Sequence, residues 1–148
     1  MEPCARRTLS EWVALRQALW PETPEQDHLS ESQAMIWEPE KARAFLARVP
    51  GGVAAGFAEA ALRHDYVNGC ASSPVVFVEG IYVQPAFRKQ GLARLLVRAV
   101  EEWAVRLGCR ELASDTELHN RDSQQMHAAL GFEETERVVC FRKLLPGS

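Results

Sequence analysis

The sequence predicts one α/β (α+β) domain over residues 1–148, in which a mixed, mostly antiparallel sheet is flanked by helices in the order β-α-α-β-β-β-α-β-α-β-β. The length of 148 residues is that of one ordinary domain. A composition of 47% apolar and 25% charged residues can fill a conventional core, which excludes a disordered or collagen-like chain. Segments with helical periodicity also alternate with segments rich in β-branched and aromatic residues, as a sheet covered by helices requires.

Two helices are expected near the start of the chain. Residues 8–11 (TLSE) have the form of a capping box and precede apolar residues on one helical face, which predicts a helix over 8–19. Trp20-Pro21 ends this helix. Residues 23–26 (TPEQ) repeat the start signal, with proline at the first helical position, and predict a second helix that reaches about residue 36.

The middle of the chain is expected to form strands. Residues 43–49 and 53–62 flank a Pro-Gly-Gly turn and predict a hairpin, and the polar stretch 63–74 predicts a loop. Residues 74–83 (PVVFVEGIYV) are dense in β-branched and aromatic residues and predict a central strand. Glycine inside a strand marks a bulge or a close approach, so Glu79-Gly80 predicts one at that point.

The remaining elements follow from spacing and glycine stops. Apolar residues at i, i+3 and i+4 predict a helix over 91–107. A short strand over 110–116 and a helix over 120–130 are expected next. Residues 132–144 predict a final pair of strands that carries Val138, Val139 and Phe141.

Charge and composition exclude several function classes. The chain has 17 basic and 20 acidic residues and a net charge of −3, so nucleic acid is not expected as a partner. No apolar run approaches the roughly 20 residues of a membrane helix, and the first residues do not form a signal peptide. The cysteines show neither C-x-x-C nor zinc-ligand spacing, which predicts no metal and reduced thiols in a cytoplasmic protein; they are Cys4, Cys70, Cys109 and Cys140.

Residues 84–93 (QPAFRKQGLA) connect the central strand to the next helix and form a candidate anion site. A helix N-terminus presents unpaired N–H groups and the positive end of the helix dipole, and no acid interrupts the basic residues of 88–98. The spacing fits neither the Rossmann fingerprint nor the P-loop. The alternative is that Gly91 only makes a turn and the basic side chains are solvated.

The stretch resembles motif A of the GNAT acyl-CoA N-acyltransferases, because Arg88-x-x-Gly91-x-Ala93 follows a strand that ends in Ile81-Tyr82-Val83. Longer strings are similar to the aminoglycoside 6'-N-acetyltransferases of that superfamily, and Trp20-Pro21 also fits. These strings are 65–69 (DYVNG), 73–81 (SPVVFVEGI), 113–116 (ASDT) and 130–137 (LGFEETER). The likeness runs from about Trp12 to Lys143.

The resemblance implies a GNAT-type domain that transfers acetyl from acetyl-CoA, the co-substrate, to the 6'-amino group of aminoglycoside antibiotics, conferring resistance. It implies a homodimer as well. The backbone of Ile81, Tyr82 and Val83 would pair with the pantetheine arm as an added strand, and the following loop would hold the pyrophosphate. The implied coenzyme-binding residues are Ile81, Tyr82, Val83, Arg88, Lys89, Gln90, Gly91, Leu92, Ala93, Arg94 and Asn120. Asn120 has a second interpretation as a helix N-cap.

An acidic, aromatic pocket for the cationic acceptor is also implied, formed by Trp20, Thr23, Tyr66, Glu79, Asp115 and Glu136. Simpler interpretations remain for four of these residues. The two aromatic residues would be core or rim residues, Glu136 a surface acid and Thr23 a helix cap. Glu79 and Asp115 are harder to explain in this way, because a carboxylate inside an apolar strand loses solvation unless it is partnered or functional.

The chemistry requires a base, because an alkylamine is mostly ammonium at neutral pH. Asp115 is the first candidate for the base and Glu79 the second, and the N–H of Val83 would stabilise the oxyanion. No Cys lies beside a His in these motifs, so direct attack on the thioester is expected. His127 stands where many GNAT proteins have a tyrosine, as a candidate general acid or a packed or capping residue. The alternatives are a protein or polyamine acceptor, or non-catalytic binding of coenzyme A or drug.

Overall fold

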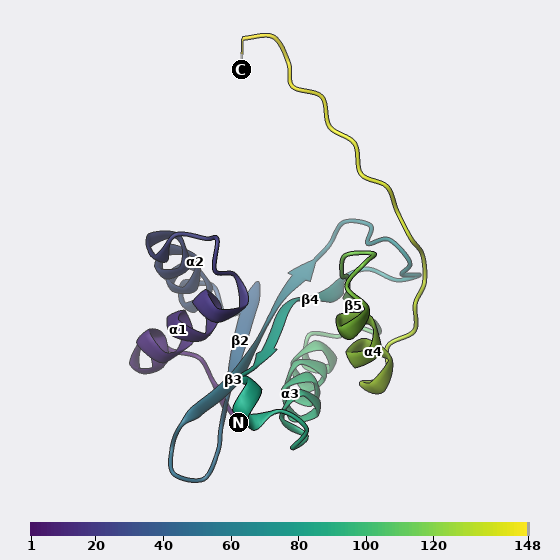
Figure 1. Cartoon of the computed structure of the whole chain (residues 1–148). Helices are drawn as coiled ribbons and strands as arrows, with labels where there is room; N and C mark the ends of the chain where they lie inside the picture. Colours follow the sequence, from purple (N-terminus) through teal and green to yellow (C-terminus); the bar gives the residue numbers. More distant parts are fainter. Residues whose placement is uncertain (148) are drawn as a thin grey trace. The chain divides into compact units, whose positions relative to one another are not determined.

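The computed structural model describes residues 1–147, which form two compact units, one over Met1–Asp115 and one from Thr116 onward. The first unit contains a five-stranded sheet of order β1-β2-β3-β4-β5 (Figure 1). All neighbouring strands are antiparallel except β4 and β5, which run parallel. The mixed, mostly antiparallel sheet is therefore confirmed. The strands are β1 Glu2–Pro3, β2 Ala42–Arg48, β3 Ala54–Arg63, β4 Val75–Val83 and β5 Leu112–Ser114.

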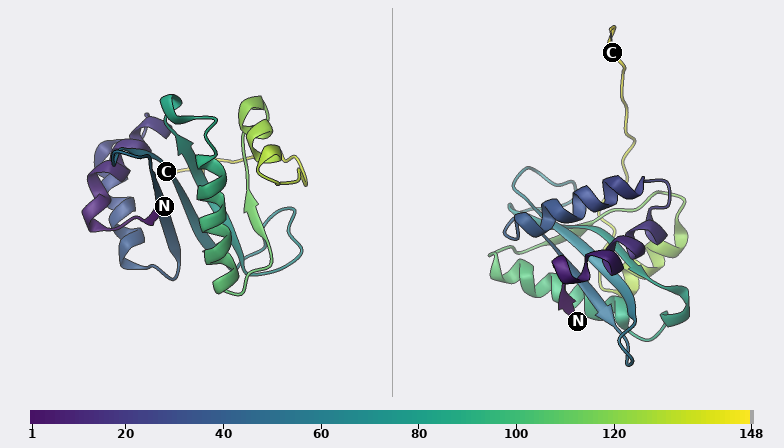
Figure 2. Two further views of the ribbon diagram at one scale, coloured as in Figure 1. Left: turned by 90° about the horizontal axis from the view of Figure 1, so that it is seen from below. Right: turned by 90° about the vertical axis from the view of Figure 1, so that its left-hand side faces the viewer.

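Helices cover both faces of this sheet. Helices α1 (Leu9–Leu19) and α2 (Glu25–Trp37) lie on one face, and α3 (Leu92–Arg106) lies on the other (Figure 2). Strand alternation explains the two layers. Leu46 and its strand partner Phe57 pack against α1. The residues next to them along each strand point to the opposite face of the sheet, which α3 covers. Two single 3₁₀ turns, η1 (Arg6–Thr8) and η2 (Pro85–Phe87), precede α1 and α3.

The predicted capping box of the first helix is not formed. The Thr8 hydroxyl accepts from Ala5 N at 2.9 Å and donates to Ala5 O at 3.0 Å, so it closes η1 and α1 begins at Leu9. Glu11 instead binds the guanidinium of Arg48 through both oxygens, at 2.7 and 2.8 Å. A bidentate contact with a charged donor is stronger than a bond to one backbone N–H, which explains the outcome.

The hairpin and the strand bulge agree with the sequence-based prediction. Strands β2 and β3 join through a turn in which Gly51 and Gly52 have φ of +100° and +91°. Between β3 and β4 the register shifts, because Glu59 lies opposite Gly80 while Ala60 lies opposite Val78. Glu79 is therefore the extra residue of a bulge, as expected.

The second unit contains α4 (Arg121–Ala129), which confirms the predicted helix over 120–130. The predicted strand pair over 132–144 is wrong for this structure, since residues 132–147 form no strand or helix. A strand is held by a ladder to a neighbouring strand, and none of the described residues supplies one. The apolar side chains of the predicted strands are consequently exposed, with Val139 at 78% and Phe141 at 91%.

Candidate active site

One edge of β4 is open beyond its contact with β5. The parallel pairing covers Val76–Val78, so within the first unit the far end of β4 has a strand neighbour on the β3 side alone. Gln84 N donates to Ala55 O at 2.8 Å, and ladder bonds alternate along a strand. Val83 therefore directs its N–H and C=O to the open edge, as does Ile81. An extended ligand can add there as a further strand.

The segment after β4 forms an anion cradle at the start of α3. Lys89 and Gly91 adopt left-handed backbone conformations, with φ of +64° and +81°. No side chain caps α3 at Gly91, and a Cβ added to this glycine would meet nothing within 4 Å. The first N–H groups of α3 have no intrahelical partner, and the space beside Gly91 is open. This geometry fits a phosphate group.

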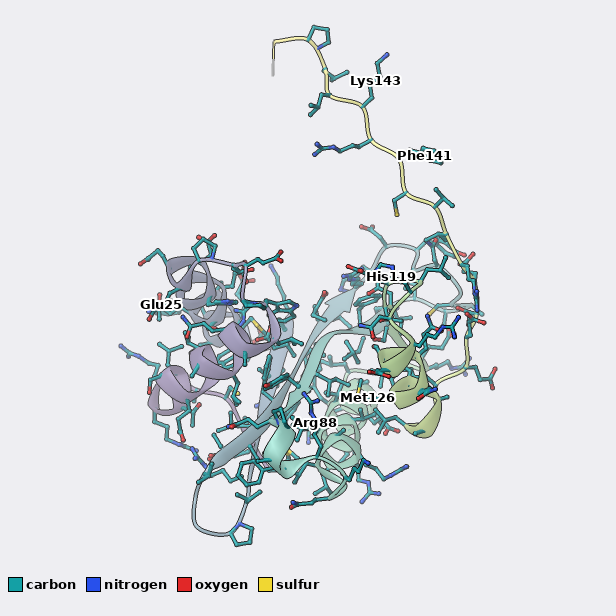
Figure 3. The ribbon with its side chains drawn as sticks, viewed as in Figure 1. Glu25, Arg88, His119, Met126, Phe141 and Lys143 are labelled. Carbon is teal, nitrogen blue, oxygen red and sulfur yellow. The ribbon has the colours of Figure 1, made fainter. Side chains whose placement is uncertain are left out.

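Arg88 ties this segment to the end of β4 (Figure 3). Its Nε donates to Val83 O at 2.8 Å, and its guanidinium lies 5.6 Å from the centre of the Tyr82 ring. The Val83 carbonyl at the open edge therefore already accepts a hydrogen bond, which leaves the Val83 N–H available there. Arg88 thus fixes the position of the loop relative to the strand, besides contributing positive charge.

Trp20 is brought against the bulge of β4 from the end of α1. A Cβ on Gly80 would lie 2.6 Å from Cζ2 of the Trp20 indole, so the ring packs directly on the strand backbone. Gly80 therefore lies next to the bulge and also permits the close approach of the Trp20 ring to the strand backbone. Thr23 follows in the same turn, where its N–H donates to Trp20 O at 3.2 Å. Its hydroxyl does not cap α2, so the helix-cap interpretation is wrong.

Glu79 and Asp115 lie at the point where two strands separate. The last parallel pair is Val78 with Ser114. Glu79 directly follows Val78, and Asp115 directly follows Ser114. Neither is buried, which corrects the desolvation argument for them. The Glu79 side chain is 38% exposed and accepts from Arg63 at 2.7 Å. A bulged residue turns away from the ladder, which explains its access to solvent.

Tyr66 lies in the loop between β3 and β4 and is 74% exposed, so it is not a core residue. The second unit holds the other predicted site residues. Asn120 caps α4 by accepting from Ser123 N at 3.1 Å, as its alternative interpretation stated. His127 Nδ1 donates to Ser123 O at 2.7 Å, and its ring packs edge-on to Phe132. Glu136 is exposed in the segment without strands, not in the strand pair expected for it.

Sequence reasoning missed a buried polar cluster beneath the bulge. Glu59, 3% exposed, accepts from Trp12 Nε1 at 2.8 Å and lies 3.0 Å from Arg16 Nε. Burial raises the pKa of Glu59 to about 7, although the guanidinium of Arg16 and the indole of Trp12 oppose this. A glutamate inside the apolar run GFAEAAL was the available signal.

Comparison with known proteins agrees with this geometry. Residues 12–132 match the Acetyltransferase (GNAT) family. The chain belongs to this family.

Relatives within the GNAT family match almost the whole chain. An aminoglycoside N(6')-acetyltransferase type 1 of Serratia marcescens is 54% identical over 142 residues, which cover 96% of this chain and 97% of the relative. The protein of the same name from Salmonella typhimurium is 51% identical over 138 residues, 93% of this chain and 94% of the relative.

Solved structures of GNAT proteins match as well. AAC(6')-Iy in complex with the bisubstrate analogue CoA-S-monomethyl-acetylneamine has a TM-score of 0.93 and 49% identity, with 97% of each chain covered. AAC(6')-Ih from Acinetobacter baumannii has a TM-score of 0.92 and 45% identity, with 97% of this chain and 96% of that chain covered. The GNAT fold is thereby shown for this chain.

Two further properties of residues 1–147 bear on the site of this GNAT protein. None of the described helices is long and apolar enough to cross a membrane. Within the same residues, no three His, Cys, Asp or Glu side chains are grouped so that they could hold a metal ion.

Proposed function

We propose that this GNAT protein transfers the acetyl group of acetyl-CoA to the 6'-amino group of aminoglycoside antibiotics, and so confers resistance to them. The observation that carries the proposal is the arrangement around β4. Its open edge at Ile81 and Val83, the anion cradle at Gly91 and the carboxylate of Glu79 lie along β4 and its connection to α3, and Asp115 follows the neighbouring strand β5. The names of the relatives above supply the acceptor class.

Acetyl-CoA fits the open edge and the cradle together. The open backbone groups of β4 would pair with the amides of the pantetheine arm, and the N-terminus of α3 would bind the pyrophosphate. The residues that would hold the co-substrate are Ile81, Tyr82, Val83, Arg88, Lys89, Gln90, Gly91, Leu92, Ala93 and Arg94. Asn120 of the second unit stays a prediction for this role.

The acceptor would bind beside the bulge, where Glu79 and Asp115 attract the ammonium groups of an aminoglycoside. Trp20 supplies an apolar wall, and Tyr66 and Thr23 are further candidates. Glu136 stays a prediction for this role.

Transfer would proceed by direct attack of the amine on the thioester, without a covalent enzyme intermediate. Asp115, or Glu79 as the second candidate, takes a proton from the ammonium group so that the amine can attack. The amine nitrogen bonds to the carbonyl carbon of the thioester, and the Val83 N–H at the open edge stabilises the resulting oxyanion. The oxyanion then collapses, the C–S bond breaks, and the nitrogen releases its second proton to solvent. The departing thiolate accepts a proton, for which His127 stays a candidate donor. Burial raises the pKa of the Cys4, Cys70 and Cys109 thiols, which disfavours a covalent cysteine intermediate.

We also propose that both units work as one acetyltransferase domain over residues 1–148, because the family match over 12–132 extends across both. A homodimer is supported by the exposed apolar side chains of the C-terminal segment, which need a cover that another copy can supply. The four free cysteines favour a reducing cytoplasm, and a net charge of −3 disfavours nucleic acid as a partner.

The test is release of free thiol from acetyl-CoA with and without kanamycin or tobramycin. Drug-dependent release is expected, with a single acetyl gain on kanamycin by mass spectrometry and none on an analogue that lacks the 6'-amine. Equal modification of both compounds would contradict the regiochemistry. Release with a peptide or polyamine alone would indicate another acceptor, and binding without any release would indicate a non-catalytic role.

A further inference from the structure

The indole of Trp20 is enclosed by four groups of the first unit. The ring of His28 stacks on it at 6.5 Å between centroids, and Phe57 meets it edge-on at 6.0 Å. The guanidinium of Arg16 lies 5.2 Å from its centre. The backbone at Gly80 forms the fourth contact. These contacts oppose rotation of the Trp20 side chain.

His28 contacts the Trp20 main chain as well as its ring. It is fully buried, and its Nε2 lies 3.1 Å from Trp20 O. Because a carbonyl oxygen only accepts, Nε2 carries the hydrogen and donates it. Nδ1 then has no hydrogen-bond partner among the described residues. A buried polar atom without a partner is costly, so an apolar side chain would serve packing better than this histidine.

Arg16 connects α2 to the strand pair that contains the bulge. It is buried, and one of its terminal nitrogens donates to His28 O and to the Ser32 hydroxyl, both at 3.2 Å. Its Nε lies 3.0 Å from the Glu59 carboxylate, and Glu59 is the strand partner of Gly80. Ion pairs and hydrogen bonds therefore join α1, α2 and β3 around the tryptophan.

Gly80 completes the enclosure on the strand side. A Cβ at this position would lie 2.6 and 2.7 Å from two carbons of the Trp20 ring. Any other residue would have to displace the indole from β4. The ring therefore rests on the backbone between Glu79, a candidate acceptor contact, and Ile81, the start of the open edge.

We propose that His28, Arg16 and Gly80 are positioning residues that hold the Trp20 ring against the β4 bulge and thereby set the affinity of the acceptor site. The inference rests on the proposed function, since Trp20 borders the acceptor only if the acceptor binds beside Glu79. These three residues act through Trp20 and touch neither substrate.

His28→Phe tests the hydrogen bond while keeping a buried ring, and His28→Gln restores a donor at a similar reach. The KM for kanamycin should rise about tenfold in His28→Phe, as expected for one lost hydrogen bond that orders a binding wall. The kcat and the KM for acetyl-CoA should stay within about twofold, and His28→Gln should recover most of the loss. Ser30→Ala on the exposed face of α2 is the matched control, because the Ser30 hydroxyl donates to Gln26 O one turn earlier in the same helix.

A double-mutant comparison shows whether the effect passes through Trp20. In a Trp20→Ala background, His28→Phe should change the KM for kanamycin by less than twofold. The same tenfold rise in both backgrounds would overturn the proposal. So would a loss of kcat and of both affinities together with a lower Tm, since that is the signature of general structural damage.

An NMR measurement without substrates separates failure of this inference from failure of the proposed function. The chain has four tryptophans, so ¹⁵N-labelled protein gives four indole signals, and Trp20→Phe identifies the one from Trp20. That signal should shift in His28→Phe and in Gly80→Ala, and stay in place in Ser30→Ala. An unchanged signal in both variants would overturn the enclosure. A shifted signal in a protein that acetylates no aminoglycoside would instead refute the proposed function and the link to acceptor affinity.

Discussion

Glu59 and Glu79 lie near each other on neighbouring strands but have opposite surroundings. Glu59 follows the regular ladder and points into the layer beneath α1, where it is 3% exposed. Glu79 is the bulged residue, and its side chain is 38% exposed beside Arg63. One extra residue in a strand thus determines which carboxylate takes part in packing and which is available to a ligand.

Asp115→Asn should lower kcat by roughly 10²–10⁴-fold, the usual contribution of a general base. The amide keeps the size of the side chain but removes the proton acceptor. Relative activity should recover in alkali, where the acceptor amine is already free. The measurement is the pH profile of acetylation at saturating drug.

Glu79→Gln is the control for this prediction, because it removes the neighbouring carboxylate and leaves Arg63 without this ion pair. A larger loss of kcat in Glu79→Gln, with Asp115→Asn affecting only the apparent affinity, would reassign the base to Glu79.

Glu59 should make stability depend on pH near neutrality. Burial raises the pKa of Glu59 from 4.5 to about 7, so between these pH values the folded protein keeps a proton that the unfolded chain has released. The resulting stabilisation is complete below about pH 4.5 and is lost as the pH rises through 7. Urea unfolding of wild type and Glu59→Gln at several pH values measures it.

The difference in unfolding free energy between these two proteins should fall by at most about 1.4 kcal/mol per pH unit across that window. A difference that is constant from pH 5 to 8 would mean that Arg16 keeps the carboxylate ionised throughout.

At the scale of elements, the connection from β4 to α3 forms the candidate binding site for acetyl-CoA. The strand ends with open backbone groups, and the helix begins at Gly91 with a left-handed backbone and no side-chain cap. Arg88 joins the two by its bond to Val83 O. The same short segment therefore supplies both a strand edge and a helix N-terminus.

Gly91→Val should weaken acetyl-CoA binding at least tenfold and leave aminoglycoside binding within about twofold. A β-branched residue is strained at a φ of +81°, so the cradle must change its shape. Isothermal titration calorimetry measures both affinities.

Gly51→Val is the matched control, since Gly51 has a φ of +100° and, like Gly91, open space around a Cβ. It lies in the β2–β3 turn, so it should lower the Tm without changing acetyl-CoA affinity. Equal affinity losses in both variants would mean that the cradle is not the pyrophosphate site.

At the scale of the whole molecule, the C-terminal segment is unusual for a stable monomer. Its apolar residues Val138, Val139, Phe141, Leu144 and Leu145 are each at least 58% exposed. Figure 3 shows Phe141 and Lys143 along this segment, which has neither helix nor strand. Residues 138–141 (VVCF) are rich in β-branched and aromatic side chains, which is typical of a strand, so a second copy of the chain is the proposed source of the missing neighbour.

Light scattering at micromolar concentration should therefore give the mass of two chains of 16.6 kDa each. Val139→Asp and Phe141→Asp should reduce it to one chain, because a buried unpaired carboxylate opposes association. Arg142→Asp, also in the exposed segment, is the control and should remain dimeric. A single-chain mass for the wild type would contradict the dimer.

Local patterns in the sequence determined most of the elements. Periodicity identified the helices, and the Pro-Gly-Gly turn and Glu79-Gly80 identified the hairpin and the bulge. The candidate coenzyme loop was also predictable, because its glycine and its basic residues lie within one short segment. These features depend on neighbours in the chain, whose preferences are visible in the residues themselves.

Tertiary structure decided what depends on distant partners. Glu11 binds the guanidinium of Arg48 instead of forming the predicted capping box. The buried hydrogen bond from Trp12 to Glu59 joins residues that are 47 apart in the chain. Asn120 and His127 proved to be engaged with their own helix, and residues 132–147 formed no strand without a neighbour. A side chain's partner and a strand's neighbour are chosen by proximity in space and by desolvation, neither of which a local pattern contains.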